Sequence, residues 1–314
     1  MNIKIGTDCS GIEAPVQALK KLKKRYGITY DHIFSSEIDP YAIKFIKENY
    51  NPKILYGDIK KRDVSTISDI DLYVAGFSCQ PFSLANKFKT PVDPRLNLYE
   101  SCVDLIFEKQ PSCFLLENVQ TLTTLDGGSY FRDILKQLSK KDEQGNEIYE
   151  IQHKIMNSKE YGIPQSRKRL YIIGLKKDII KKPFEFPKEK KMKKLSTFID
   201  KKDTRKNPIK EANKQLFQNI PSDSIFIDVG FRKCRFPNSG KWAPCVTAQP
   251  NLWNVQMGRK ANVTEYLKLQ GFPTYPKFKQ PISDHQMKIK IGNSMTVDVI
   301  EQLLEKMFKS MNYL

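Results

Sequence analysis

The chain has 314 residues, 39% of them hydrophobic and 28% charged, which is ordinary for a globular protein and leaves room for one large domain and a smaller one. No stretch approaches the ~18 uninterrupted apolar residues of a membrane-spanning helix, and the first residues lack the basic head and long apolar core of a signal peptide. The 53 Lys and Arg against 35 Asp and Glu give a formal net charge of +18, which favours a polyanionic partner such as nucleic acid over a merely solvated lysine-rich surface.

The cysteine pattern argues against a metal site or a disulfide framework. Six cysteines are scattered without a C-x-x-C pair or a histidine cluster, which is typical of a reducing compartment. We therefore expect no metal and a cytoplasmic location, associated with the nucleoid if the partner is DNA. The cysteines are Cys9, Cys79, Cys102, Cys113, Cys234 and Cys245.

Strand-like and helix-like segments alternate along the first part of the chain. This alternation predicts βαβ units, and so an α/β fold with a doubly wound, mostly parallel sheet covered by helices on both faces. The expected strands lie within residues 1–11, 30–40, 53–59, 70–79, 111–119 and 167–177, and the expected helices are 12–27, 41–50 and 98–110.

The character of the sequence changes after Gly174. Between Lys176 and Lys214 the chain holds fifteen Lys or Arg and six acidic residues, with prolines and weak periodicity. We expect a domain boundary near residue 176 and a smaller, irregular domain over residues 176–260. Helical patterns return after it, so residues 261–314 are expected to join 1–175 in one large domain, with the C-terminal helix packed on it.

Candidate ligand-binding groups follow the predicted strands, at the edge where doubly wound folds bind ligands. A turn at Gly11 lets a ligand approach the backbone, Glu37 can hold ribose hydroxyls, and Asp58 can accept a hydrogen bond from an adenine amino group. Each also has a simpler interpretation, as a turn glycine or a helix cap. Glu13 stands where a dinucleotide motif would have glycine, and its charge would repel phosphate. The pattern disfavours a nicotinamide dehydrogenase and favours a cofactor without phosphates, such as S-adenosylmethionine.

The segment "GFSCQPFS" places Cys79 after the fourth predicted strand, and Glu117 ends the next one. Arg167 and Arg169 are two residues apart and so share one face of an extended segment. A thiol, a carboxyl group and guanidinium groups suit attack on an electron-poor ring, although the arginines could instead be surface charges. No histidine is close to Cys79 in sequence, which disfavours a protease-like pair, while His32, His153 and His285 could still approach it in the fold.

In chain order, these segments resemble the motifs of the cytosine-C5 DNA methyltransferases over nearly the whole chain. The segments "DCSGIEAPVQAL", "EIDPYAI" and "GDI" resemble the three cofactor motifs, and "GFSCQPFS", "ENV" and "QSRKR" the nucleophile, acid and arginine motifs. The segments "YLKLQGFP" and "IGNSM" resemble the two closing motifs. The ordered set of eight is far more specific than any one member.

The resemblance implies a Rossmann-like S-adenosylmethionine-dependent methyltransferase that acts on C5 of cytosine in a specific duplex DNA sequence. Cys79 would attack C6 of a flipped-out base, Glu117 would protonate N3, and Arg169, supported by Arg167, would contact O2. Residues 84–97 would form a loop that closes over DNA. The cofactor pocket would contain Cys9, Gly11, Ile12, Glu37, Ile38, Asp58, Ile59, Leu98 and Asn293, and the substrate site Ser78, Gln80, Pro81, Asn118, Gln165 and Thr247.

The same resemblance makes residues 176–260 the target-recognition domain, in which "CRFPNSGKWAPCVTAQPN" resembles a recognition-loop element. Binding to DNA should then weaken steeply as salt rises. The chain departs from the family pattern at several positions without losing a group that the chemistry requires: Cys9, Glu13, Ser78, Cys245 and Lys268.

Two alternatives remain open at this point: a tRNA cytosine-C5 methyltransferase on the same scaffold, and a DNA-binding relative that has lost catalysis. Intact Cys79, Glu117 and Arg169 argue against the second. A monomer is the simplest expectation.

Overall fold

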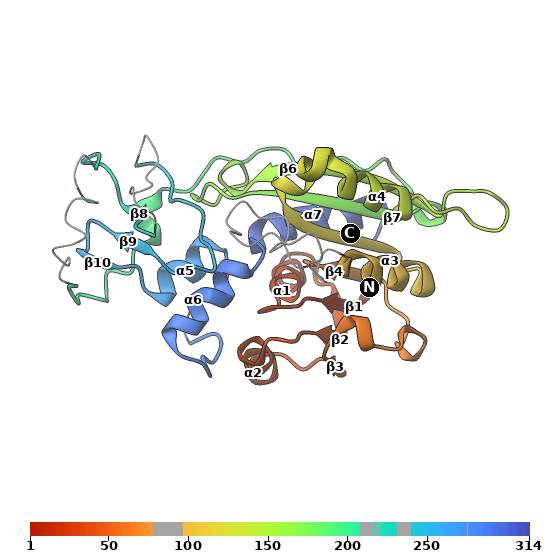
Figure 1. The fold of residues 1–314 in the computed structure, drawn as a ribbon, viewed down its shortest axis with the longest axis horizontal. Coiled ribbons are helices and arrows are strands. Elements are labelled where there is room, and N and C mark those ends of the chain that lie inside the picture. Colours follow the sequence, from red (N-terminus) through yellow and green to blue (C-terminus); the bar gives the residue numbers. More distant parts are fainter. Residues whose placement is uncertain (78–96, 208–216, 218–219, 231–239, 275) are drawn as a thin grey trace.

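The computed structural model (Figure 1) describes residues 1–77, 97–207, 217, 220–230, 240–274 and 276–314. A large sheet lies at one end of the chain's long axis and a small sheet with two helices lies at the other. Among the described residues, no helix is both long enough and apolar enough to span a bilayer.

The large sheet has seven strands in the order β3-β2-β1-β4-β5-β7-β6. Neighbouring strands run parallel from β3 to β5, and only β7 runs antiparallel to its neighbours. The predicted doubly wound, mostly parallel α/β sheet is therefore confirmed. The strands are β1 (Asn2–Asp8), β2 (Thr29–Ser36), β3 (Ile54–Tyr56), β4 (Leu72–Ala75), β5 (Cys113–Val119), β6 (Tyr149–Asn157) and β7 (Lys168–Lys176).

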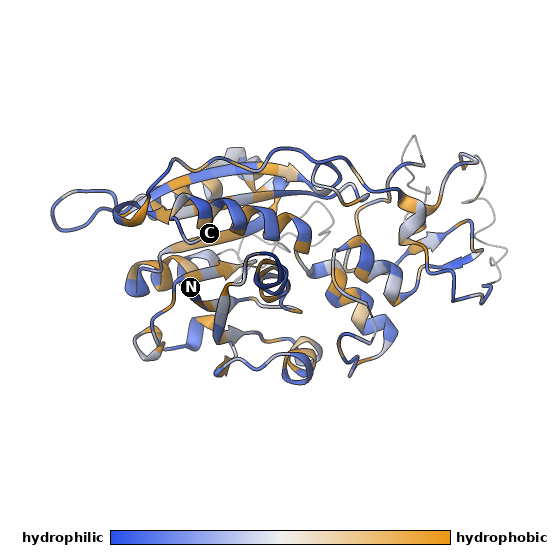
Figure 2. Ribbon diagram, turned by 180° about the vertical axis from the view of Figure 1, so that it is seen from behind, coloured by the Kyte–Doolittle hydropathy of each residue, from blue (hydrophilic) through white to orange (hydrophobic). Residues whose placement is uncertain are grey.

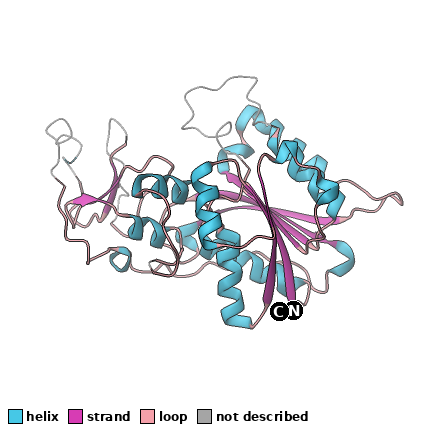
Figure 3. Cartoon of the chain, turned by 90° about the horizontal axis from the view of Figure 1, so that it is seen from below, coloured by secondary structure: helices cyan, strands magenta, loops and turns pink. Residues whose placement is uncertain are grey.

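Helices cover both faces of this sheet, as Figure 3 shows. The helices α1 (Ala14–Tyr26), α2 (Pro40–Asn49) and α7 (Val297–Ser310) share one hydrophobic cluster with β1. The helices α3 (Leu98–Lys109) and α4 (Ser129–Leu138) share a second cluster with Tyr73 and Phe114, which point to the opposite face. Central strands are buried on both faces, which explains why β4 is uniformly apolar. Figure 2 shows hydrophilic and hydrophobic stripes along the surrounding helices.

The small sheet has three antiparallel strands in the order β10-β9-β8. They are β8 (Phe226–Asp228), β9 (Leu252–Asn254) and β10 (Arg259–Lys260), and α5 (Val263–Leu269) and α6 (Asp284–Asn293) lie beside them in Figure 1. We call these elements the small lobe. After the small lobe the chain enters α7, which packs on α1. There Nζ of Lys21, on α1, lies 2.9 Å from Oδ2 of Asp298, on α7.

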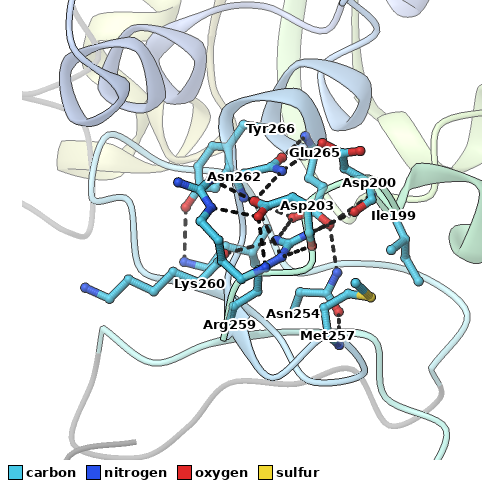
Figure 4. A network of polar contacts seen from close by, with 12 residues as sticks. Ile199, Asp200, Asp203, Asn254, Met257, Arg259, Lys260, Asn262, Glu265 and Tyr266 are labelled. Carbon is cyan, nitrogen blue, oxygen red and sulfur yellow. Dashed lines mark hydrogen bonds and ion pairs between the residues drawn. The ribbon is translucent and has the colours of Figure 1, made fainter. Parts of the chain in front are cut away.

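A buried polar network holds the small lobe together (Figure 4). Arg259 is 1% exposed and donates to both carboxylate oxygens of Glu265, at 2.8 and 3.0 Å. Arg259 also donates to the backbone oxygens of Asp200 and Asp203, so the network joins the preceding loop to β10 and α5. Asn262 and Glu265 form the capping box that begins α5.

The lysine-rich segment that follows β7 runs back along the large sheet. The backbone N–H groups of Lys181 and Lys182 donate to the carbonyl oxygen of Ser310, at the end of α7. Further along, the N–H of Lys193 donates to the carbonyl oxygen of Gly162. The segment thus contacts α7 and the loop between β6 and β7 before the chain enters the small lobe, and the boundary expected near residue 176 stays a prediction.

Candidate active site

The loops that carry the predicted site residues leave the large sheet at one edge. Strands β1, β2, β4 and β5 run parallel, so their carboxyl ends meet there. The turn at Gly11 follows β1, Glu37 follows β2, and Gly76 and Phe77 follow β4. The side chain of Glu117 comes from the last part of β5.

Glu117 is a buried acid beside an arginine. Its side chain is 11% exposed, and Oε1 lies 3.2 Å from Nε of Arg169 on the neighbouring strand β7. Burial raises the pKa of Glu117, because the charged form loses its hydration, and the positive charges of Arg169 and Arg167 oppose this shift only in part. The carboxyl group therefore holds a proton more readily than an exposed glutamate.

The chain that leads to Cys79 begins directly beside this acid. A Cβ placed on Gly76 would lie 3.6 Å from Oε2 of Glu117 and 2.7 Å from Cε of Met295, so a larger residue would crowd the site. Asn118 donates from Nδ2 to the carbonyl oxygen of Phe77 at 3.0 Å, which ties the end of β4 to β5. The next predicted site residues lie outside the described part of the chain: Ser78, Cys79, Gln80 and Pro81, together with 84–96 of the expected loop.

Arg167 and Gln165 are buried and bonded to the backbone of distant segments. Arg167 donates to the carbonyl oxygens of Val246 at 2.7 Å and Ser294 at 2.6 Å, and Gly292 accepts a third bond at 3.2 Å. Burial, and then the charge of Arg169, lowers the pKa of Arg167. Gln165 donates to the carbonyl oxygen of Leu269 at 2.7 Å and accepts from the N–H of Val246 at 2.8 Å. These two side chains join the segment at Val246 and the end of α6 to β7.

The remaining predicted substrate residue, Thr247, follows Val246 and is exposed. Its hydroxyl donates to the carbonyl oxygen of Gln249 at 3.1 Å. The bonds that Arg167 and Gln165 make to Val246 therefore fix the backbone from which Thr247 projects, on the side of the site formed by the small lobe.

Glu37 is held in place by backbone N–H groups. Its Oε2 accepts from Gly11 at 2.8 Å, and its Oε1 accepts from Ile38 at 2.8 Å and Asp39 at 2.9 Å. The next side chain, Ile38, is 72% exposed, although it is apolar. A fixed carboxylate and an exposed apolar side chain fit the hydroxyls and the ring face of a nucleoside.

The other predicted cofactor residues lie around the same edge. Asp58 accepts from the N–H of Lys60 at 3.0 Å and so caps a short 3-10 helix, which is the simpler of its two interpretations. Ile12 and Ile59 are buried, Cys9 and Leu98 are half-buried, and Asn293 is exposed at the end of α6. A Cβ on Gly11, which has φ of +55°, would meet no atom closer than 4.0 Å, so space remains above the turn. The residues present therefore fit a nucleoside cofactor.

Two buried carboxylates beneath this edge were not predicted as part of the site. Asp8 is paired with Arg62 through two hydrogen bonds, at 2.5 and 2.8 Å, and also accepts from the hydroxyl of Tyr73 at 2.7 Å. Glu13 has a left-handed backbone, with φ of 60°, and points inward, where it accepts from Ser35 at 2.6 Å. No sequence signal shows the long-range partner Arg62. The positive φ of Glu13 is explained by its place in the turn before α1.

Comparison with known proteins agrees with this geometry. The family model for C-5 cytosine-specific DNA methylases matches residues 8–309. The type II methyltransferase M.HaeII of Haemophilus aegyptius is 33% identical over 288 residues, which cover 90% of this chain and 87% of that protein. M.NgoBI of Neisseria gonorrhoeae, also a type II methyltransferase, is 34% identical over 290 residues, which cover 88% and 86%.

Solved structures show the same fold at lower identity. The Dnmt2 methyltransferase of S. pombe aligns with a TM-score of 0.67 and 18% identity, over 99% of this chain and 100% of that chain. The methyltransferase EhMeth of Entamoeba histolytica aligns with a TM-score of 0.65 and 20% identity, over 98% of both chains. The chain therefore belongs to the C-5 cytosine-specific DNA methylase family and is a DNA (cytosine-5-)-methyltransferase.

Proposed function

We propose that this protein transfers a methyl group from S-adenosylmethionine to C5 of cytosine within a specific duplex DNA sequence. One observation carries the proposal: the buried acid Glu117, with its raised pKa and its arginine partner, lies where the chain begins its approach to Cys79. An acid that keeps its proton is the group needed to polarise the ring of a bound cytosine.

The cofactor would bind at the carboxyl edge of β1 and β2. Glu37 would accept hydrogen bonds from ribose hydroxyls, the exposed side chain of Ile38 would cover one face of the adenine, and Gly11 would leave room for the methionine part. Asp58, Leu98 and Asn293 would complete the pocket. When bound, S-adenosylmethionine supplies an electrophilic methyl group.

Four residues of this chain would act on the cytosine, after it leaves the DNA stack. The thiolate of Cys79 bonds to C6, and the electron pair of the C5–C6 double bond moves towards C5. Glu117 donates its proton towards N3, while Arg169, held beside Arg167, donates a hydrogen bond to O2. After C5 has gained the methyl group, with S-adenosylhomocysteine as the leaving group, a base removes the C5 proton. The electron pair re-forms the C5–C6 double bond, the Cys79 sulfur leaves C6 as a thiolate, and N3 returns its proton to Glu117.

Duplex DNA is the polymer that we propose, rather than tRNA. The curated relatives over most of the chain are type II methyltransferases, and the chain carries a formal charge of +18. Residues 176–260 would contact base edges while lysines hold phosphates. Affinity for DNA should fall steeply with salt, because each phosphate contact releases counterions. Because these relatives are type II methyltransferases, the enzyme would also be the modification partner of a restriction enzyme.

Transfer of tritiated methyl groups to duplex DNA and to tRNA tests the proposal. We expect label in DNA, and none with Cys79→Ala, while Cys102→Ala, which changes a buried thiol in α3, should keep the activity. DNA with 5-fluorocytosine should form a covalent adduct at Cys79, because no proton can leave C5. Label confined to tRNA, or full activity of Cys79→Ala, would refute the proposal. Bisulfite sequencing of host DNA would then identify the site.

A further inference from the structure

The turn that carries Glu37 and Ile38 is attached to α6, an element of the small lobe. The attachment is an ion pair between Nζ of Lys290, on α6, and Oδ2 of Asp39, the residue that follows the turn. Lys290 is 7% exposed although it is charged. Buried lysines are rare unless they are paired, so the position of this ammonium group calls for an explanation.

Asp39 uses its two carboxylate oxygens for two different tasks. Oδ1 accepts from the N–H groups of Tyr41 and Ala42, both at 3.0 Å, and so caps α2. Oδ2 faces Lys290. Partial burial would raise the pKa of Asp39, but the bonds from Lys290 and from these N–H groups hold it below its usual value. The cap of α2 therefore does not need Lys290. The ion pair must have a function other than capping this helix.

A continuous series of contacts runs from this ion pair to the cofactor edge. The N–H of Asp39 donates to Glu37 at 2.9 Å, and Glu37 accepts in turn from Gly11 at 2.8 Å. On the other side, Lys290 lies three residues before Asn293 on the same helix. Gly11, Glu37 and Asn293 are three of the proposed cofactor residues. The ion pair thus joins the two walls of that pocket.

The other end of α2 is also attached to the segment before α6. Asn49 donates to the carbonyl oxygen of Lys279 at 2.9 Å, and the N–H of Lys279 donates back to Asn49 at 2.7 Å. The rings of Phe45 and Phe278 pack edge to face with centroids 5.5 Å apart. These contacts already hold the segment before α6 against α2, so Lys290 is not required for that attachment.

From these contacts we propose that Lys290 is a positioning residue for the cofactor, which fixes the turn of Glu37 and Ile38 through Asp39 and so links the cofactor pocket to the small lobe. This inference rests on the proposed use of S-adenosylmethionine. It gives a role to the burial of the Lys290 ammonium group, because water and salt screen a pair with one buried partner less than a fully exposed pair; the side chain of Asp39 is 35% exposed.

The test is the binding of S-adenosylhomocysteine to the full chain, measured by calorimetry. The Lys290→Met variant should bind S-adenosylhomocysteine with an affinity about tenfold lower. This is the change expected when one hydrogen bond to a charged group is lost. Lys290→Arg should recover most of the loss.

In steady state, KM for S-adenosylmethionine should rise in Lys290→Met while KM for DNA stays the same. Asp39→Asn keeps an oxygen for the cap of α2, and in its background Lys290→Met should have no further effect.

The matched control is Lys279→Met. It removes an exposed ion pair with Glu48, at 3.4 Å, between the same two segments, and keeps the backbone bonds to Asn49. Hydrogen exchange without any ligand supplies a second measurement: the amides of residues 37–42 should exchange faster in Lys290→Met and not in Lys279→Met.

The outcomes separate this inference from the proposed function. Unchanged affinity and unchanged exchange in a folded Lys290→Met, or equal effects of Lys279→Met, would overturn the positioning role and leave the proposed function intact. A wild-type protein that binds no S-adenosylhomocysteine would overturn the proposed function, and the exchange measurement would still decide whether Lys290 fixes the turn.

Discussion

Glu265 and Glu117 are both buried glutamates paired with arginine, and they differ in how many hydrogen bonds they accept. In the small lobe, Glu265 is 0% exposed and accepts from Arg259 through both of its oxygens. It also accepts from the N–H groups of Asp200 and Asn262 and from the amide of Asn254. These five hydrogen bonds replace the water that burial removes from the carboxylate.

Glu117 contrasts with this arrangement. Among the described residues, its Oε1 accepts no hydrogen bond of good geometry, although Nε of Arg169 lies 3.2 Å away. Burial therefore raises the pKa of Glu117, because too little replaces the lost water. The contrast teaches that an acid becomes available for proton transfer when its site leaves the carboxylate incompletely bonded. A fully bonded carboxylate such as Glu265 serves structure.

Glu117→Gln should distinguish most clearly between a role in proton transfer and a role in stability. The amide keeps the shape of the side chain but cannot donate an acidic proton, so methyl transfer should fall about 10²- to 10⁴-fold, the range of general acid catalysis. The melting temperature should change little, because few bonds are lost. Single-turnover transfer and thermal unfolding measure the two effects. If Glu117→Gln lost as much stability as Glu265→Gln, Glu117 would also be a structural residue, and the proposed difference between the two glutamates would be wrong.

Glu265→Gln should produce the opposite result. The amide nitrogen would face the donors of Arg259 and Asn262, and Arg259 would lose its main counter-charge. Unfolding free energy should fall by about 3 kcal/mol, the lower end for a broken buried pair, because Oδ2 of Asp203 still lies 3.6 Å from Nε of Arg259. Urea unfolding measures the change. The control is Arg205→Gln, which removes a 74% exposed arginine from its pair with Asp203 and should change stability little.

The position of Glu117 could be predicted from the sequence, whereas its bonding could not. Strand patterns and parallel topology place Glu117 and the start of the Cys79 loop at one edge, because carboxyl ends of parallel strands meet. The missing hydrogen bonds depend on side-chain geometry. The same holds for Arg167, whose carbonyl partners at Val246, Gly292 and Ser294 are 79 to 127 residues away in the chain.

Two elements of the fold were not predicted. The strand β6 lies at the edge of the sheet, and its burial alternates poorly, with three consecutive exposed residues that include Lys154. An edge strand packs on fewer neighbours than a central one, so its sequence carries a weaker apolar pattern. The helix α4 does carry a sequence signal that was not used, because its apolar residues recur at helical spacing and all pack in the second cluster: Tyr130, Phe131, Ile134, Leu135 and Leu138.

The raised pKa of Glu117, and the effect of Arg169 on it, can be tested by the pH dependence of methyl transfer. In the proposed mechanism Glu117 acts in its protonated form, so the transfer rate should fall as pH rises through its pKa, and that fall should lie above the ordinary value of 4.5. Arg169 lowers this pKa, so Arg169→Met should move the falling limb to still higher pH, while its lost contact with the base reduces the maximum rate. Glu117→Gln should have no such limb. Rate–pH profiles of the three proteins at saturating DNA provide the measurement, and a limb that moves to lower pH in Arg169→Met would show that Arg169 does not act on the proton of Glu117.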